Sequence, residues 1–182
     1  MYSFSCDEEA LITKLCSIYK SKIQKIFNTE INDYSFGKKY AEAQDVFINK
    51  DDQYGYYGKT DFKWMAIVMK KGINDLHIIQ EEEEKLTFQK FLSYGTQIRN
   101  EVWHNKINLQ NIQSIYYDAV QTLKKIWEMT KKNYSQKCKI FSSHNIEFLD
   151  TLLKKWGSNV SETSKPQILK KDEDIIIIDE NQ

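Results

Sequence analysis

Apolar residues recur at three- and four-residue spacing through most of the first 157 positions, without the two-residue alternation of a half-buried strand. The pattern predicts helices at about 7–32, 38–48, 61–76, 82–105, 108–127 and 143–156. The one proline, Pro166, follows the last of them, so long uninterrupted helices are expected. We therefore predict an all-α fold, an antiparallel four-helix bundle with extra short helices and a flexible C-terminal tail.

Two features of the predicted helix 82–105 are informative. The run QEEEEKL at 80–86 predicts a solvated turn followed by an acidic first helical turn. Gly95 lies on the apolar stripe of this helix, where glycine lowers helix propensity. Its presence there predicts the close approach of a neighbouring helix.

The composition changes after Gly157, so we assign residues 1–157 to one helical domain and 158–182 to a linker and tail. The tail contains four isoleucines, Ile175, Ile176, Ile177 and Ile178, between acidic residues. Such a segment suits strand addition to the sheet edge of a partner, and it resembles a SUMO-interaction motif. The alternatives are an isoleucine strand docked on the bundle itself and an unoccupied tail.

The charge balance restricts the classes of partner. Lys and Arg together number 26, as do Asp and Glu, so a nucleic-acid-binding role requires a local patch rather than bulk positive charge. Scattered lysines could supply one: Lys63, Lys70, Lys71, Lys85, Lys90 and Lys106. The acidic start of the chain and the lack of a long apolar run predict a soluble, intracellular protein of the nucleus or cytoplasm, with no membrane partner.

The common cofactor and metal motifs are missing from the sequence. No Gly-rich dinucleotide or phosphate loop, GxSxG or HExxH occurs, and the three cysteines form no CxxC pair. We therefore expect no cofactor, no metal site and no disulfide framework.

The segment TQIRNEVWHNK, residues 96–106, holds the only arginine of the chain, Arg99. On a helix Asn100 and His104 share one face, while Arg99 and Trp103 share the adjacent one. A guanidinium binds phosphate oxygens through two parallel donors, and an imidazole transfers protons near neutral pH. This set suits RNA cleavage without a metal, in which the 2′-hydroxyl attacks its own phosphate and arginine stabilises the developing charge.

The stretch IRNEVWHNKINLQNIQSIYYDAVQTLKKIW resembles the closing helices of a HEPN domain, in particular the type carried by a PIN-domain endonuclease of nuclear mRNA surveillance. The family signature is an arginine followed by a polar residue, and then a histidine, with four to six residues between the arginine and the histidine. Arg99, Asn100 and His104 match it, with four residues between Arg99 and His104. The resemblance implies a four-helix bundle that dimerises, with the motifs of two copies facing each other in a composite cleft. In active members the arginine holds the scissile phosphate and the histidine does acid–base work, whereas inert members bind RNA or assemble complexes.

Two interpretations of this motif stay open at this point. In the first, the chain is a HEPN-type RNA-associated domain whose active form would be a metal-independent endoribonuclease acting as a homodimer. In the second, it is a non-catalytic helical subunit that recruits partners through its dimer face and its tail, while Arg99 and Asn100 bind the carbonyls at the end of their helix.

Overall fold

The computed structural model describes residues 2–44, 61–135 and 139–157, with side chains from Asp7 onward. The α-helices of these residues are α1 Tyr2–Asp33, α2 Ser35–Glu42, α4 Phe62–Lys71, α5 Glu82–Trp103, α6 Tyr117–Asn133 and α7 Ser143–Gly157. No strand occurs in these ranges, which confirms the predicted all-α class. None of the described helices has a stretch long and apolar enough to cross a membrane.

The N-terminus of α4 forms as predicted, but the helix is shorter than the apolar pattern suggests. Asp61 caps it, with its side chain accepting a hydrogen bond from Lys63 N at 2.8 Å. The helix ends at Gly72, whose N–H bonds to Val68 O, and a single 3-10 turn, Ile73–Asp75, follows. Glycine has low helix propensity, so the helix stops there although apolar residues continue.

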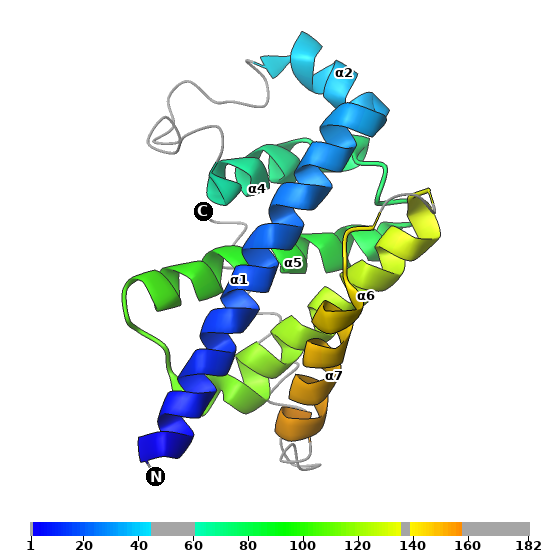
Figure 1. Ribbon diagram of the computed structural model, residues 1–182. Helices are drawn as coiled ribbons and strands as arrows, with labels where there is room; N and C mark the ends of the chain where they lie inside the picture. Colours follow the sequence, from blue (N-terminus) through cyan, green and yellow to red (C-terminus); the bar gives the residue numbers. More distant parts are fainter. Residues whose placement is uncertain (1, 45–60, 136–138, 158–182) are drawn as a thin grey trace.

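The longest helix, α1, packs mainly against α2, α4 and α5 (Figure 1). Its side chains also contact α6, where the Tyr19 hydroxyl donates to Ala119 O, and α7, where Glu8 accepts from Trp156 Nε1. The chain then passes from α5 to α6, which packs against α5 on one side and α7 on the other. Figure 1 shows α5 crossing behind α1 obliquely. An antiparallel bundle of four long helices therefore stays a prediction, although the packing around α1 and α5 forms one core.

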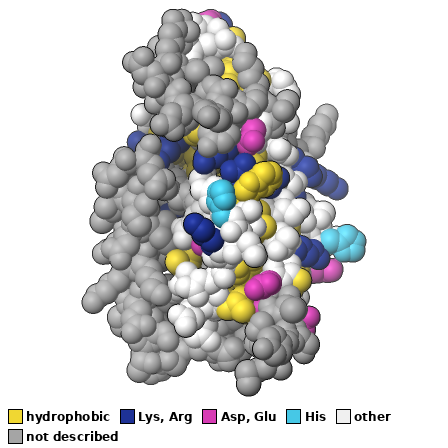
Figure 2. Space-filling model, turned by 90° about the vertical axis from the view of Figure 1, so that its left-hand side faces the viewer, with side chains coloured by type: hydrophobic (Ala, Val, Ile, Leu, Met, Phe, Trp, Pro, Cys, Tyr) yellow, Lys and Arg dark blue, Asp and Glu magenta, His cyan; other side chains and the backbone are white. Residues whose placement is uncertain are grey.

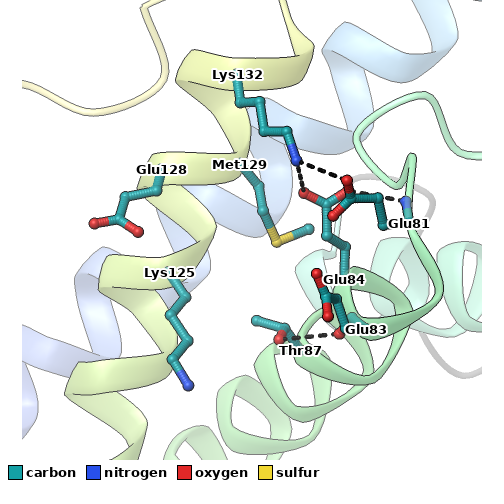
Figure 3. A pocket seen from close by; sticks show the side chains of 8 residues that line it. All are labelled: Glu81, Glu83, Glu84, Thr87, Lys125, Glu128, Met129 and Lys132. Atoms are coloured by element: carbon teal, nitrogen blue, oxygen red, sulfur yellow. Dashed lines mark hydrogen bonds and ion pairs between the residues drawn. The ribbon is translucent and has the colours of Figure 1, made fainter.

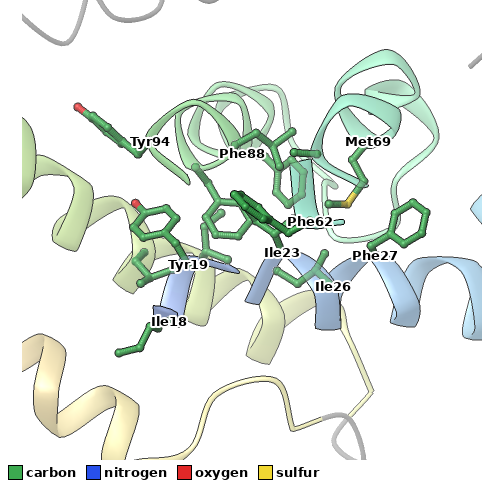
Figure 4. Close-up of a cluster of buried hydrophobic side chains, with 14 of the residues drawn as sticks. Ile18, Tyr19, Ile23, Ile26, Phe27, Phe62, Met69, Phe88 and Tyr94 are labelled. Carbon is green, nitrogen blue, oxygen red and sulfur yellow. The ribbon is translucent and has the colours of Figure 1, made fainter. Parts of the chain in front are cut away.

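Part of the core lies where α1, α4 and α5 meet (Figure 4), and Gly95 lies at the α1–α5 contact. A Cβ atom at Gly95 would lie 2.6 Å from Ile23 Cδ1 and 3.3 Å from Tyr19 Cδ1. Both of these α1 side chains are fully buried. The predicted close approach at Gly95 is confirmed, and it brings the C-terminal half of α5 against α1.

The connection from α5 to α6 is more irregular than a single helix capped by Asn108. Asn108 does cap, accepting from Gln110 N at 3.0 Å, but the turn that it starts is a 3-10 turn, Leu109–Asn111. A π turn, Ile112–Tyr116, follows before α6 begins. The wider π turn changes the angular position of each side chain. Ile112 is therefore only partly buried, whereas Tyr116, Ala119 and Leu123 further along the chain are fully buried.

Lys22 on α1 is an almost fully buried lysine. Its Nζ donates to Ile140 O at 2.9 Å and lies 5.1 Å from the centre of the Phe141 ring. Burial, helped by the positive charge of nearby Lys25, lowers the pKa of the Lys22 ammonium to about 8. The folded chain therefore binds this proton more weakly than the unfolded chain does.

This lowered pKa predicts that stability rises with pH. Between about pH 8 and the ordinary lysine pKa of 10.5, the unfolded chain holds the Lys22 proton and the folded chain does not. Raising the pH through this window should stabilise wild type, relative to Lys22→Met, by about 2 kcal/mol. Urea unfolding from pH 7 to pH 10 measures this difference. The exposed Lys14→Met on the same helix is the control, and a difference that does not change with pH would contradict the assignment.

Several predicted features lie outside the described residues. They include the tail isoleucines Ile175–Ile178 and the linker from residue 158 onward. Of the three cysteines, the structure describes the side chain of Cys16, which is buried and free.

Candidate functional site

The motif residues lie at the C-terminal end of α5, which closes in a Schellman turn. His104 N donates to Asn100 O at 3.0 Å, Asn105 N to Val102 O at 3.2 Å and Lys106 N to Glu101 O at 2.7 Å. Asn105 has a φ of 54°, the left-handed conformation that this turn requires and that asparagine tolerates. The local sequence therefore ends the helix just after Trp103 and satisfies its last carbonyls with backbone donors.

Arg99 is half-buried and lies between two aromatic rings. Its guanidinium carbon is 4.9 Å from the centre of the Trp103 ring, one turn later on α5, and 5.9 Å from that of Phe62 at the start of α4. Such stacking orients the planar fork by its faces and leaves its N–H edges for other acceptors.

The polar neighbours of Arg99 leave most of its guanidinium N–H donors without an acceptor among the described residues. Arg99 Nη1 donates to Asn100 Oδ1 at a long 3.3 Å. Glu101, the nearest acid in sequence, does not pair with it and instead accepts from the Tyr116 hydroxyl at 2.8 Å. Burial raises the pKa of Glu101 despite this hydrogen bond. Within the described residues, Arg99 has no carboxylate partner.

His104 and Trp103 are on the surface at this end of α5. The side chain of Trp103 is 70% exposed, although its spacing puts it beside the apolar stripe of the helix. His104 is exposed too, and its imidazole forms no hydrogen bond with the part of the chain that the structure describes. Figure 2 shows this face, where a histidine and an exposed hydrophobic side chain lie beside Lys and Arg side chains.

The structure thus brings three of the motif side chains together and leaves the fourth apart. Arg99 contacts Asn100 and Trp103, but no described contact joins the His104 imidazole to the guanidinium. The carbonyls at this helix end accept from the backbone of the Schellman turn, and the hydrogen bond of Arg99 goes to Asn100.

Two residues at the site do not belong to the sequence motif. Phe62 stacks on Arg99, and Lys20 of α1 points its Nζ at the same ring, 5.6 Å from its centre. Lys20 and Phe62 are distant from Arg99 in sequence, so no local spacing could identify them. The only available signal was the start of a helix at Phe62, which its Asp61 cap predicts.

Not all of the lysines that could supply a basic patch are available for one. Lys90 forms an ion pair with the buried Asp118 of α6 at 2.8 Å, and the same carboxylate accepts from the Tyr94 hydroxyl. Lys90 is therefore part of the α5–α6 contact. Lys106, by contrast, is exposed in the turn directly after His104.

A separate hollow of about 460 Å³ lies between the N-terminal end of α5 and the C-terminal end of α6 (Figure 3). Two acids of this hollow, Glu81 and Glu84, form a capping box at the start of α5, and Lys132 pairs with both of them. Burial alone would raise the pKa of the Glu84 carboxyl, but its hydrogen bonds and the Lys132 charge lower it below its ordinary value. These two carboxylates therefore stabilise the start of α5.

The remaining observations concern metals and known proteins. Within 2–44, 61–135 and 139–157, no three His, Cys, Asp or Glu side chains gather as a metal-binding group. No family model, no curated protein and no solved structure matches this chain.

Proposed function

We propose that this chain is a HEPN-type RNA-associated domain and that two copies of it form a metal-independent endoribonuclease. One observation carries the proposal: Arg99 is oriented by Phe62 and Trp103, has no acidic partner among the described residues and lies one turn from the exposed His104. A fixed guanidinium with open N–H edges is suited to phosphate oxygens. The HEPN resemblance of the same residues supports this choice.

In the proposed reaction, the His104 imidazole takes the proton of a ribose 2′-hydroxyl. The 2′-oxygen then attacks the adjacent phosphorus, and the bond from phosphorus to the 5′-oxygen breaks. The protonated histidine of the second copy gives its proton to the leaving 5′-oxygen, so the products are a 2′,3′-cyclic phosphate and a 5′-hydroxyl. Arg99 stabilises the charge on the phosphate oxygens, and Asn100 positions Arg99 through its Oδ1.

Arg99→Lys is the first substitution to make. Lysine keeps the positive charge but loses the planar fork and its stacking, so we expect cleavage of single-stranded RNA in EDTA to fall about 100-fold. Gel analysis of cleaved RNA measures this loss. Lys125→Arg on the exposed face of α6 is a charge-conserving control that should keep full activity. If wild type does not cleave RNA even at high protein concentration, the proposed ribonuclease activity is wrong.

A second function is favoured by the exposure of Trp103. Tryptophan and arginine are the residues that most often anchor protein interfaces, and here they stack on each other at the surface. A non-catalytic helical subunit would use this pair to hold a second copy or another helical protein. That function predicts self-association that Trp103→Ala abolishes, together with no RNA cleavage by wild type.

A further inference from the structure

Two positive charges from different helices converge on one buried ring. Lys20 Nζ of α1 is 5.6 Å, and Arg99 Cζ of α5 is 5.9 Å, from the centre of the Phe62 ring, which is 2% exposed (Figure 4 labels Phe62). Both side chains can reach solvent, since Lys20 is exposed and Arg99 half-buried. Both cations therefore lie against the Phe62 ring and can reach solvent.

The packing of α1 on α5 fixes this convergence. Gly95 lets α1 approach through Tyr19 and Ile23, and Arg99 is one turn further along α5. Lys20 is the neighbour of Tyr19 in sequence. Cys16 lies one turn before Lys20 on α1. Burial raises the pKa of its thiol, and the positive charges of Lys20 and Arg99 both oppose that rise. The two charges therefore share one local environment.

No acid balances this pair within the described residues. Other described lysines pair with carboxylates: Lys39 with Asp75, Lys90 with Asp118, Lys124 with Asp150, Lys132 with Glu81 and Glu84, and Lys155 with Glu8. Lys20 and Arg99 form no ion pair there, although the chain has as many acids as bases. Two like charges held together repel each other, and an anion between them relieves that repulsion.

We propose that Lys20 is a second phosphate-binding residue of the Arg99 site, so that the site takes a ligand with neighbouring phosphate groups. For an RNA strand this inference rests on the proposed function, because Arg99 and Lys20 would then hold successive parts of one backbone. Arginine contributes the fork and lysine a point charge on a flexible stem. Both side chains contact the ring of Phe62, which holds them at one site.

The RNA arm of the test measures how binding depends on salt. Each phosphate contact of a single strand contributes about 0.7 to the slope of log K against log salt. Lys20→Gln should therefore reduce the slope by about 0.7, and Lys20→Arg should restore it. Lys14→Gln makes the same charge change on α1, where Lys14 Nζ stacks on Phe148 at 4.4 Å, and should leave the slope nearly unchanged. Equal effects of Lys20→Gln and Lys14→Gln would overturn the proposal.

A second arm uses inorganic pyrophosphate, which needs neither RNA binding nor cleavage. Millimolar pyrophosphate should raise the Tm of wild type and of Lys14→Gln, because a ligand that binds only the folded chain stabilises it. Lys20→Gln and Arg99→Gln should each lose this shift. If wild type binds no RNA, the proposed function fails, but the pyrophosphate measurement still tests Lys20. The phosphate-binding role of Lys20 is overturned if pyrophosphate does not raise the Tm of wild type, or if Lys20→Gln keeps the same rise in Tm.

Discussion

Replacing His104 by alanine is expected to lower the rate of RNA cleavage by about 10²–10⁴-fold. The reason is that alanine removes the imidazole that takes and gives the proton in the proposed reaction. RNA binding should change little, because the cations at Arg99 and Lys20 are untouched. Single-turnover cleavage and binding, both measured in EDTA, separate the two effects.

The chain offers a close control for this substitution. His144 is another exposed histidine, 92% exposed in its side chain, at the start of α7. His144→Ala should keep the wild-type cleavage rate. If His104→Ala cleaves as fast as His144→Ala, the acid–base role of His104 is wrong, and a different residue or a contaminating nuclease produces the cleavage.

Replacing Glu30 by alanine is expected to lower the free energy of unfolding by about 4 kcal/mol. The Glu30 side chain is fully buried on α1, where its carboxylate accepts from His77 N at 2.7 Å, from Ile78 N at 2.8 Å and from the Tyr134 hydroxyl. It therefore joins α1 to the segment before α5 and to the end of α6. Alanine would leave two backbone N–H groups and a tyrosine hydroxyl without their acceptor.

Urea unfolding measures this loss. Glu9→Ala on the exposed side of α1 makes the same chemical change without these contacts, and it should cost less than about 0.5 kcal/mol. Burial raises the pKa of Glu30, with the hydrogen bonds opposing this effect, so Glu30→Gln should be milder than alanine because its amide oxygen can still accept. Equal stability of Glu30→Ala and Glu9→Ala would show that this carboxylate does not hold the three segments together.

The helices could be predicted because each one depends on local patterns. Apolar spacing, the Asp61 cap, the acidic start of α5 and the glycine at position 95 are read within a few residues of where they act. The π turn before α6 could not be predicted in this way. It depends on how the α5–α6 connection packs, which no periodicity in the sequence describes.

The candidate site shows the same division. Arg99, Asn100 and His104 are close in sequence, so their placement at one helix end follows from the helix itself. The exposure of Trp103 depends on which elements pack beside this helix end, which the local pattern does not describe. Lys20 and Phe62 reach Arg99 only through the packing of α1 and α4 on α5, and that packing is a tertiary property.

We propose that Arg99 and His104 cleave RNA through the ribose 2′-hydroxyl, and the ends of the cleaved RNA test this proposal. A single-stranded RNA is incubated with the purified wild-type protein in EDTA, and the new ends are identified. We expect 2′,3′-cyclic phosphate on the upstream fragment and a 5′-hydroxyl on the downstream one. Fragments with 3′-hydroxyl and 5′-phosphate ends, or intact RNA at high protein concentration, would contradict it.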